Sequence, residues 1–217
     1  MIHISCWADR TYELDPAHSA LLVIDMQRGF LAEDVSENGE LRAIMPGLKN
    51  VVAAARERGL KIVHTREGYG ADRSDVNAAK AVMAYVGRPT PHGEFLIRGT
   101  ASHAFMEGFE PHEGEAVIDK AAFNAFHESP LAALLNEGAI TNLVLTGVTT
   151  QCCVHSTLRD AVDRGFLCLT LEDCCAAYRR EWHDATMDII RSESNLFGWI
   201  ASSGSFLAGL AAGRAGA

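Results

Sequence analysis

The chain has 217 residues, of which 48% are hydrophobic and 22% charged, a composition that fits one soluble domain with a sizeable core. Its formal net charge is −9 and its Lys and Arg residues form no cluster, which argues against nucleic acid or an anionic membrane surface as a partner. No apolar run approaches the roughly 18 residues of a membrane helix, and the N-terminal residues lack the pattern of a signal peptide.

Apolar runs of strand length alternate with amphipathic patterns of helical spacing along the chain. The predicted strands cover residues 20–25, 61–66, 115–120, 142–148, 167–172 and 196–200. The predicted helices cover residues 46–58, 75–86, 130–137, 151–165 and 180–192. This alternation predicts a three-layer α/β/α fold, doubly wound around a mainly parallel, six-stranded sheet.

We expect residues 1–217 to form a single domain with one insertion. Residues 68–111 fit the alternation least, and we interpret them as a cap over the crevice, the alternative being a mobile loop. His92 and His103 in this segment are expected to be surface residues rather than ligands. The Ala- and Gly-rich tail, residues 204–217, predicts either a short docked helix or a frayed end.

The six cysteines form no spaced disulfide framework. They are Cys6, Cys168 and the adjacent pairs Cys152/Cys153 and Cys174/Cys175. Reduced thiols are typical of the cytoplasm, and we predict that location. Adjacent cysteines are poor structural zinc ligands, so no metal site is predicted from them.

One of these cysteines has the position of a reactive thiol. The apolar run 142–148 is followed by TTQCCVHSTLRDA, which predicts that Cys153 lies in the first turn of a helix after a buried strand. Free backbone N–H groups and the helix dipole at such a turn stabilise a thiolate and can hold an oxyanion. Cys152 is the rival, because only one of two successive helical residues faces the crevice.

Two further apolar runs end in charged residues, Asp25 after LLVI and Lys120 after AVID. Residues that follow the carboxyl ends of parallel strands meet in one crevice, so an acid, a cation and a thiol are expected together there. Such a set is a nucleophile with its own proton acceptor. If the strand order is 3-2-1-4-5-6, only the long stem of Lys120 or a turn of the chain brings its ammonium group to Asp25.

On these residues the chain resembles the isochorismatase-like cysteine hydrolases. The motifs LLVIDMQRGF, VIDKAAFNAF and TGVTTQCCVHSTLRDA carry the resemblance, which spans about residues 18–200. It implies Cys153 as nucleophile, Asp25 as general base and Lys120 as the neighbouring cation, without cofactor or metal. It also implies a cis peptide before Thr149, with the backbone N–H groups of Thr149 and Cys153 forming an oxyanion hole.

The segments HTREG, LEDCC and LTGVTT look most like the biuret and triuret hydrolase branch. The implied substrate is a small ureide (biuret, triuret or a ureidoacrylate-like compound) that loses ammonia through a thioester-type intermediate. Glu193 stands where that branch suggests glutamine. The candidate substrate-binding residues are Phe30, Arg66, Asn124, Phe126, Gln151, Tyr178 and Glu193. His64, His155 and His183 are interpreted as structural residues.

Three alternatives stay open. An isochorismatase would need a cationic pocket, and the sequence has no Lys/Arg cluster. The nicotinamidase branch carries a D-x-H metal cluster, whereas residues 28–46 contain no histidine. A non-catalytic binding protein with this fold would not need the acid, cation and thiol that are all present here. We expect a homo-oligomer, a dimer or tetramer, by the same resemblance.

Overall fold

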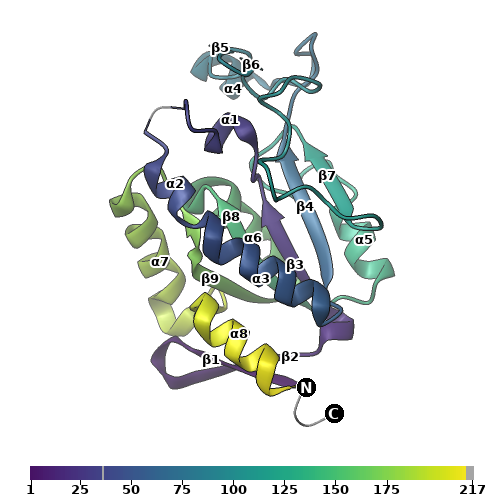
Figure 1. Cartoon of the computed structure of the whole chain (residues 1–217), viewed down its shortest axis with the longest axis vertical. Coiled ribbons are helices and arrows are strands. Elements are labelled where there is room, and N and C mark those ends of the chain that lie inside the picture. The colour runs from purple at the N-terminus through teal and green to yellow at the C-terminus, as the bar shows by residue number, and fades with distance from the viewer. Residues whose placement is uncertain (36, 214–217) are drawn as a thin grey trace.

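Two continuous runs of apolar and small residues, SALLVI and NLVLTGV, form the central strand pair, and every one of their residues is buried. The computed structural model describes residues 1–35 and 37–213, and its centre is a parallel sheet of order β10-β9-β8-β3-β4-β7 (Figure 1). The strands are β3 (Ser19–Ile24), β4 (Lys61–Glu67), β7 (Ala116–Lys120), β8 (Asn142–Val148), β9 (Leu167–Ala176) and β10 (Trp199–Ala201). The order reverses between β3 and β8, the position where open sheets of this kind bind ligands.

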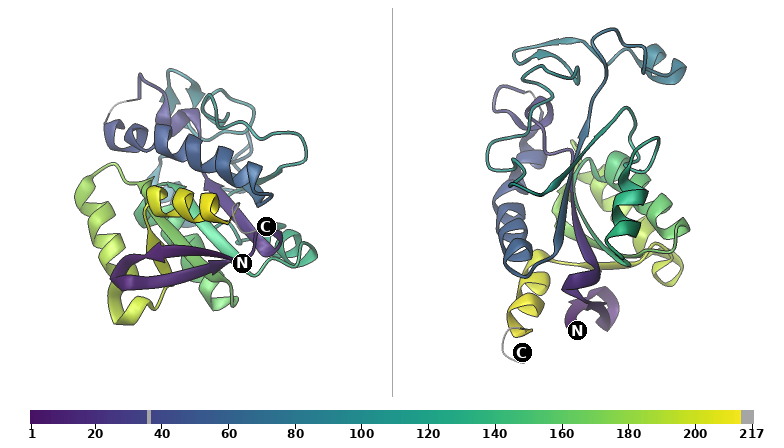
Figure 2. Two further views of the ribbon diagram at one scale, coloured as in Figure 1. Left: turned by 60° about the horizontal axis from the view of Figure 1, so that its bottom comes forward. Right: turned by 90° about the vertical axis from the view of Figure 1, so that its right-hand side faces the viewer.

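Helices cover both faces of this sheet (Figure 2). One face carries α2 (Gly39–Ala43), α3 (Met45–Glu57) and α8 (Ser203–Ala212), and the other carries α5 (Leu131–Glu137), α6 (His155–Asp163) and α7 (Arg180–Asn195). Each face has its own apolar core, with Leu48 and Leu210 in one and Leu135, Leu158 and Ile190 in the other. The predicted three-layer, doubly wound fold is therefore confirmed.

The N-terminal residues form an element that the sequence did not predict, an antiparallel hairpin of β1 (Ile2–Cys6) and β2 (Arg10–Leu14). The turn between them, η1 (Trp7–Asp9), contains no glycine, although Ala8 and Asp9 have φ of 59° and 53°. A glycine is the usual marker of such a turn. The tail docks as α8, one of the two predicted outcomes, and residues 214–217 lie outside the described residues.

Residues 68–111 contain α4 (Ala78–Met83), β5 (Pro89–Thr90) and β6 (Gly93–Glu94), which lie beyond the carboxyl ends of the strands (Figure 1). The last part of the segment returns along the sheet, where Phe105 contacts His64 of β4. Backbone hydrogen bonds tie this segment to the rest of the chain, for example from Arg28 N to Ala104 O at 2.9 Å. The helix is shorter than the predicted 75–86, because Asn77 caps its first turn and Ala84 leaves the helix with φ of 54°. The prediction of an exposed His103 is wrong, since its ring is buried near Asp119.

Shorter elements complete the chain. Turn η2 (Pro16–His18) leads into β3, and α1 (Arg28–Leu31) follows it. The regular part of α7 ends at Ser192, after which Glu193 and Ser194 have positive φ. Across the described residues, none of the helices combines the length and the apolar character that a bilayer crossing requires.

Gly147 allows β8 to approach β3 at the reversal point. A Cβ atom at this position would lie 2.1 Å from the backbone oxygen of Ile24, and φ of Gly147 is 108°. Any side chain here would push apart the two strands that lead to Asp25 and to the cysteine turn.

We predict that Gly147→Ala lowers the free energy of unfolding by more than about 3 kcal/mol, because backbone strain and a backbone clash add. Gly59→Ala is the matched control, since Gly59 also has positive φ (76°) but no atom within 4 Å of an added Cβ. We expect about 1 kcal/mol there. Urea denaturation of both variants measures the difference, and equal losses would contradict the clash.

Candidate active site

A fully buried ion pair lies at the carboxyl edge of the sheet. Asp25 follows β3, and its Oδ2 lies 2.8 Å from Nζ of Lys120, the last residue of β7. Strand β4 lies between these two strands, so the stem of Lys120 reaches across the end of β4 to Asp25. Thr65 of β4 donates a hydrogen bond from its hydroxyl to the other carboxylate oxygen of Asp25, at 2.6 Å.

The surroundings of Lys120 keep its ammonium group charged. Burial alone would lower the pKa of Lys120, but the negative charges of Asp25, Cys153 and Glu67 outweigh burial and raise it. Its Nζ also donates to the backbone oxygen of Ala122 at 2.8 Å. A permanent positive charge therefore stands beside the carboxylate and near the thiol.

The cysteine turn follows β8 directly. The Val148–Thr149 peptide bond is cis, as the sequence resemblance implied, and η3 (Thr150–Val154) is a π-helical turn that precedes α6. Cys153 thus lies in a π turn rather than in the first turn of the α-helix itself. The hydroxyl of Thr150 lies 2.9 Å from Nδ1 of His183, a contact that holds this turn against α7 and fits the structural role expected for His183.

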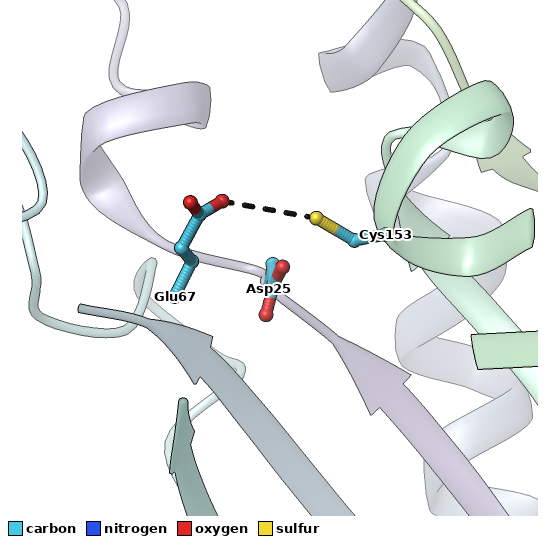
Figure 3. A group of neighbouring side chains, drawn as sticks. All are labelled: Asp25, Glu67 and Cys153. Carbon is cyan, nitrogen blue, oxygen red and sulfur yellow. Dashed lines mark hydrogen bonds between the residues drawn. The ribbon is translucent and has the colours of Figure 1, made fainter. Parts of the chain in front are cut away.

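Cys153 faces a second buried carboxylate that the sequence reasoning did not select, Glu67 at the end of β4 (Figure 3). The thiol donates to Oε2 of Glu67 over 3.8 Å, and a ligand atom of Asp25 lies within 4.8 Å of both groups. Contact with the Cys152 thiol, burial and the two carboxylates raise the pKa of Cys153 well above its ordinary value, against the effect of Lys120. These surroundings therefore favour the protonated thiol over the thiolate.

The other oxygen of Glu67 is held by three donors. The hydroxyls of Tyr69 and Tyr85 donate to Oε1 at 2.5 and 2.9 Å, and Lys80 Nζ lies 3.3 Å away. The side chain of Gln27 pairs with the backbone N–H and C=O of Glu67. The sequence contains one signal for Glu67, a charged residue at the end of a buried strand. Thr65 and Glu67 lie on the same face of β4, and Thr65 contacts Asp25, so Glu67 also faces the site.

Asp25, Glu67 and Cys153 are close enough to ligate one metal ion. However, the carboxylates already receive hydrogen bonds from Lys120, Lys80 and the neighbouring hydroxyls. A cation placed among the three ligands would stand close to two buried ammonium groups, an electrostatic arrangement that disfavours it. The donor set is thus better suited to proton transfer than to metal binding.

Two of the predicted substrate-binding residues, Tyr178 and Gln151, lie near this cluster, and a third, Phe30, follows Asp25 in α1. Tyr178 is half-buried, and both Arg88 and Cys153 are near enough to influence its pKa, which burial raises to about 12. Gln151 lies in the cysteine turn, and its Oε1 is buried without a hydrogen-bond partner among the described side chains and backbone. Phe30 packs edge to face on Phe95, with ring centroids 5.4 Å apart.

Three other candidates make contacts within the protein away from the Asp25–Lys120 pair, a fourth, Glu193, is exposed, and substrate contact by all four stays a prediction. Arg66 pairs with Asp119 at 2.7 Å, because alternate side chains of β4 point to opposite faces. Asn124 donates to Asp160 of α6 at 2.6 Å.

The remaining two are also directed away from the cluster. Phe126 stacks on Phe166, whose neighbour Leu167 begins β9 at the opposite edge of the sheet. Glu193 is exposed beyond the regular part of α7, a helix that runs back from the carboxyl edge between two parallel strands.

A hollow of about 910 Å³ opens beside Tyr178. Arg88, Arg179 and Trp182 line it, together with Glu37 and Glu40. Tyr178 is the residue of this lining on whose pKa the charge of Cys153 acts.

Comparisons with known proteins agree with this geometry. The sequence profile of the isochorismatase domain matches residues 19–205. Ureidoacrylate amidohydrolase RutB of Enterobacter sp. (strain 638) is 28% identical over 208 residues, which cover 88% of each chain. A RutB of Methylorubrum extorquens is 27% identical, with 93% of this chain and 86% of the relative covered.

Solved structures share the fold. A cysteine hydrolase from Pseudomonas syringae pv. phaseolicola superposes with a TM-score of 0.82 at 20% identity, covering 93% of this chain and 96% of the other. N-carbamoylsarcosine amidase from Thermoplasma acidophilum gives a TM-score of 0.69 at 22% identity, with 85% and 96% covered. At these identities the likeness concerns the fold alone.

We predict that Lys120→Met lowers the free energy of unfolding by about 3–5 kcal/mol, because Asp25 would be left as an unpaired buried charge. Adding Asp25→Asn should restore part of the loss, since the double variant buries no charge at this place. Arg164→Met, which breaks an exposed pair with Asp160, should cost below about 1 kcal/mol. Chemical denaturation measures the free energy of unfolding of each variant. If the losses from Lys120→Met and Asp25→Asn simply add in the double variant, the two charges do not interact.

Proposed function

The chain belongs to the isochorismatase family, and from this premise we propose that it is a cysteine-dependent amidohydrolase that cleaves the terminal carbamoyl C–N bond of a small ureide. The observation that carries the proposal is the buried Asp25–Lys120 pair beside a buried thiol at the reversal point of the sheet. The RutB relatives, which by name act on ureidoacrylate, support a ureide as the substrate class.

In the first half-reaction, Cys153 transfers its proton to Asp25 as its sulfur attacks the carbonyl carbon. We propose that the backbone N–H groups of Thr149 and Cys153 hold the resulting oxyanion, because both residues border the same turn after the cis bond. Lys120 stays charged throughout, so its positive charge stabilises the negative charge that develops on the sulfur as the proton leaves. Asp25 then gives the proton to the leaving nitrogen, the C–N bond breaks, and ammonia departs.

In the second half-reaction, water attacks the S-acyl carbon while Asp25 accepts one of its protons. The C–S bond breaks, the sulfur recovers that proton, and the carboxylated product leaves. Atoms balance as one water consumed and one ammonia released per carbamoyl group. Each step needs only a base, a fixed cation and an oxyanion site, all of which come from this chain.

Biuret, triuret and ureidoacrylate-like compounds are the proposed substrates. They are small, planar and rich in hydrogen-bonding groups, so they require polar partners close to the thiol. Gln151, with its buried unpaired oxygen, and Tyr178 are the proposed partners among the residues that the sequence singled out. We propose that residues 68–111 act as the cap of this site, because Tyr69, Lys80 and Tyr85 all contact Glu67.

We predict that Cys153→Ala abolishes hydrolysis while Cys152→Ala retains most of it. Only the first variant loses the sulfur that faces Glu67 and Asp25. The second should change turnover by less than ~10-fold, because it removes only a neighbouring thiol. The measurement is the rate of ammonia release by each purified variant. Loss of activity in Cys152→Ala with activity kept in Cys153→Ala would assign the nucleophile to Cys152.

We predict that the wild-type protein releases ammonia from a ureide faster than from nicotinamide, by up to ~10⁴-fold in kcat/KM, because polar groups built for ureide nitrogens stay unpaired around an aromatic amide. A panel of biuret, triuret, 3-ureidoacrylate, nicotinamide and isochorismate, run with and without EDTA, tests this. EDTA should leave the rates unchanged. Turnover of nicotinamide or isochorismate alone would reject the ureide class, and activity restored by zinc would reject the metal-free reaction.

A further inference from the structure

We propose that Glu67 selects the substrate by accepting a hydrogen bond from the nitrogen that stays on the carbonyl carbon after ammonia leaves. The inference rests on the proposed ureide hydrolysis and deepens it. In a ureide an N–H group joins the terminal carbamoyl carbon to the rest of the molecule, whereas in the matching amide a methylene group takes that place. The inference predicts that the enzyme distinguishes the two compounds through one buried carboxylate.

The two oxygens of Glu67 have different surroundings. Oε1 accepts hydrogen bonds from Tyr69, Tyr85 and Lys80. Among the residues described, Oε2 accepts a hydrogen bond from the Cys153 thiol alone. The side chain is 3% exposed and that of Lys80 5%, so water does not compete for either group. One oxygen is therefore fixed by the protein, and the other is directed at the nucleophile.

A carbonyl carbon attacked by Cys153 must lie next to Sγ, and hence next to Oε2 of Glu67, which is 3.8 Å from that sulfur. Asp25 must protonate the departing nitrogen, so the leaving amino group lies on the Asp25 side. The retained nitrogen then lies on the Glu67 side. Its N–H replaces the thiol as the donor to Oε2, which also frees Cys153 to give its proton to Asp25.

The buried Lys80 Nζ lies 3.3 Å from Oε1, so an ion pair orients the carboxylate whose other oxygen is the acceptor. A charge-assisted hydrogen bond to a ureide N–H strengthens binding by ~10- to 100-fold over a methylene group that leaves the oxygen unpaired. Because Lys80 and Tyr85 come from the cap, the same segment that closes the site also orients its selecting residue.

The substitution Glu67→Gln gives a sharp test, because Lys80 fixes which way the amide points. The ammonium group of Lys80 can only donate and therefore requires an acceptor, so the amide oxygen takes the place of Oε1 and the amide nitrogen takes the place of Oε2. The acceptor that faces Cys153 thereby becomes a donor. A ureide N–H now meets another N–H, whereas a methylene group meets no opposing hydrogen-bond donor.

The experiment measures kcat/KM for two matched pairs, biuret with malonamide and 3-ureidopropionate with glutaramate. In each pair a methylene group replaces the retained N–H. We expect the wild type to prefer the ureide over the amide, and Glu67→Gln to reduce that ratio by ~10- to 100-fold. Intrinsic differences in substrate reactivity cancel, because only the change in ratio between proteins is compared.

Glu115→Gln is the matched control. Glu115 is also a carboxylate in ion pairs beside β4, with Arg56 at 2.6 Å and His64 at 2.9 Å, but it lies outside the Cys153 cluster. Its substitution should leave the ureide-to-amide ratio within ~3-fold of the wild-type ratio, a change too small to reflect a lost substrate contact. If Glu67→Gln alone fails to fold, as judged by thermal melting, Glu67→Gln with Lys80→Met removes the uncompensated ammonium and keeps both tyrosine donors.

The outcomes separate the two proposals. A wild type that cleaves no ureide overturns the proposed function and this inference together. A wild type that cleaves ureides, with an unchanged ratio in the folded glutamine variants, overturns the inference alone. Equal loss of both substrates in those variants would likewise assign Glu67 a role in positioning Cys153 rather than in selecting the nitrogen.

Discussion

The buried pair of Asp25 and Lys120 is the interaction on which the rest of the site depends. Two charges removed from water cost several kcal/mol each unless they face one another with further hydrogen bonds. Thr65 and the backbone of Ala122 supply those bonds, so the end of β4 and the turn after β7 are fixed in relation to β3. Strand β4 separates β3 from β7, so the pair forms only because the side chain of Lys120 is long enough to cross one strand.

Much of this arrangement follows from sequence pattern. Continuous apolar runs defined the strands, and charged residues at their carboxyl ends marked Asp25 and Lys120, because side chains at those ends have a single crevice to enter. The N-terminal hairpin was missed because its left-handed turn positions are occupied by Ala8 and Asp9 instead of glycine. Glu67 was not predicted, although it neighbours the candidate Arg66, because successive side chains of a strand lie on opposite faces and the pattern does not say which face borders the thiol.

The contacts of Glu67 were beyond prediction for a different reason. Lys80 and Tyr85 reach it from a segment with little regular structure, and no local pattern relates those residues to the end of β4. Position in a motif likewise did not predict the contacts of Asn124 and Phe126, which hold the loop after β7 against Asp160 of α6 and against Phe166 before β9. Residues that hold a site together and residues that contact its ligand look alike in a sequence.

The cluster contains two carboxylates and two ammonium groups beside one thiol, so their charges cancel before substrate enters. Moving the thiol proton to Asp25 creates a thiolate and removes a carboxylate charge, and the total charge does not change. A neutral ureide can therefore enter and react in a buried space without bringing a counter-ion. Asp25, Lys120 and Glu67 lie at the edge of the sheet, whereas Lys80 and Tyr85 approach Glu67 from residues 68–111. A substitution at Lys80 or Tyr85 therefore changes the contacts of Glu67, while the Asp25–Lys120 pair keeps its own partners, Thr65 and the backbone of Ala122.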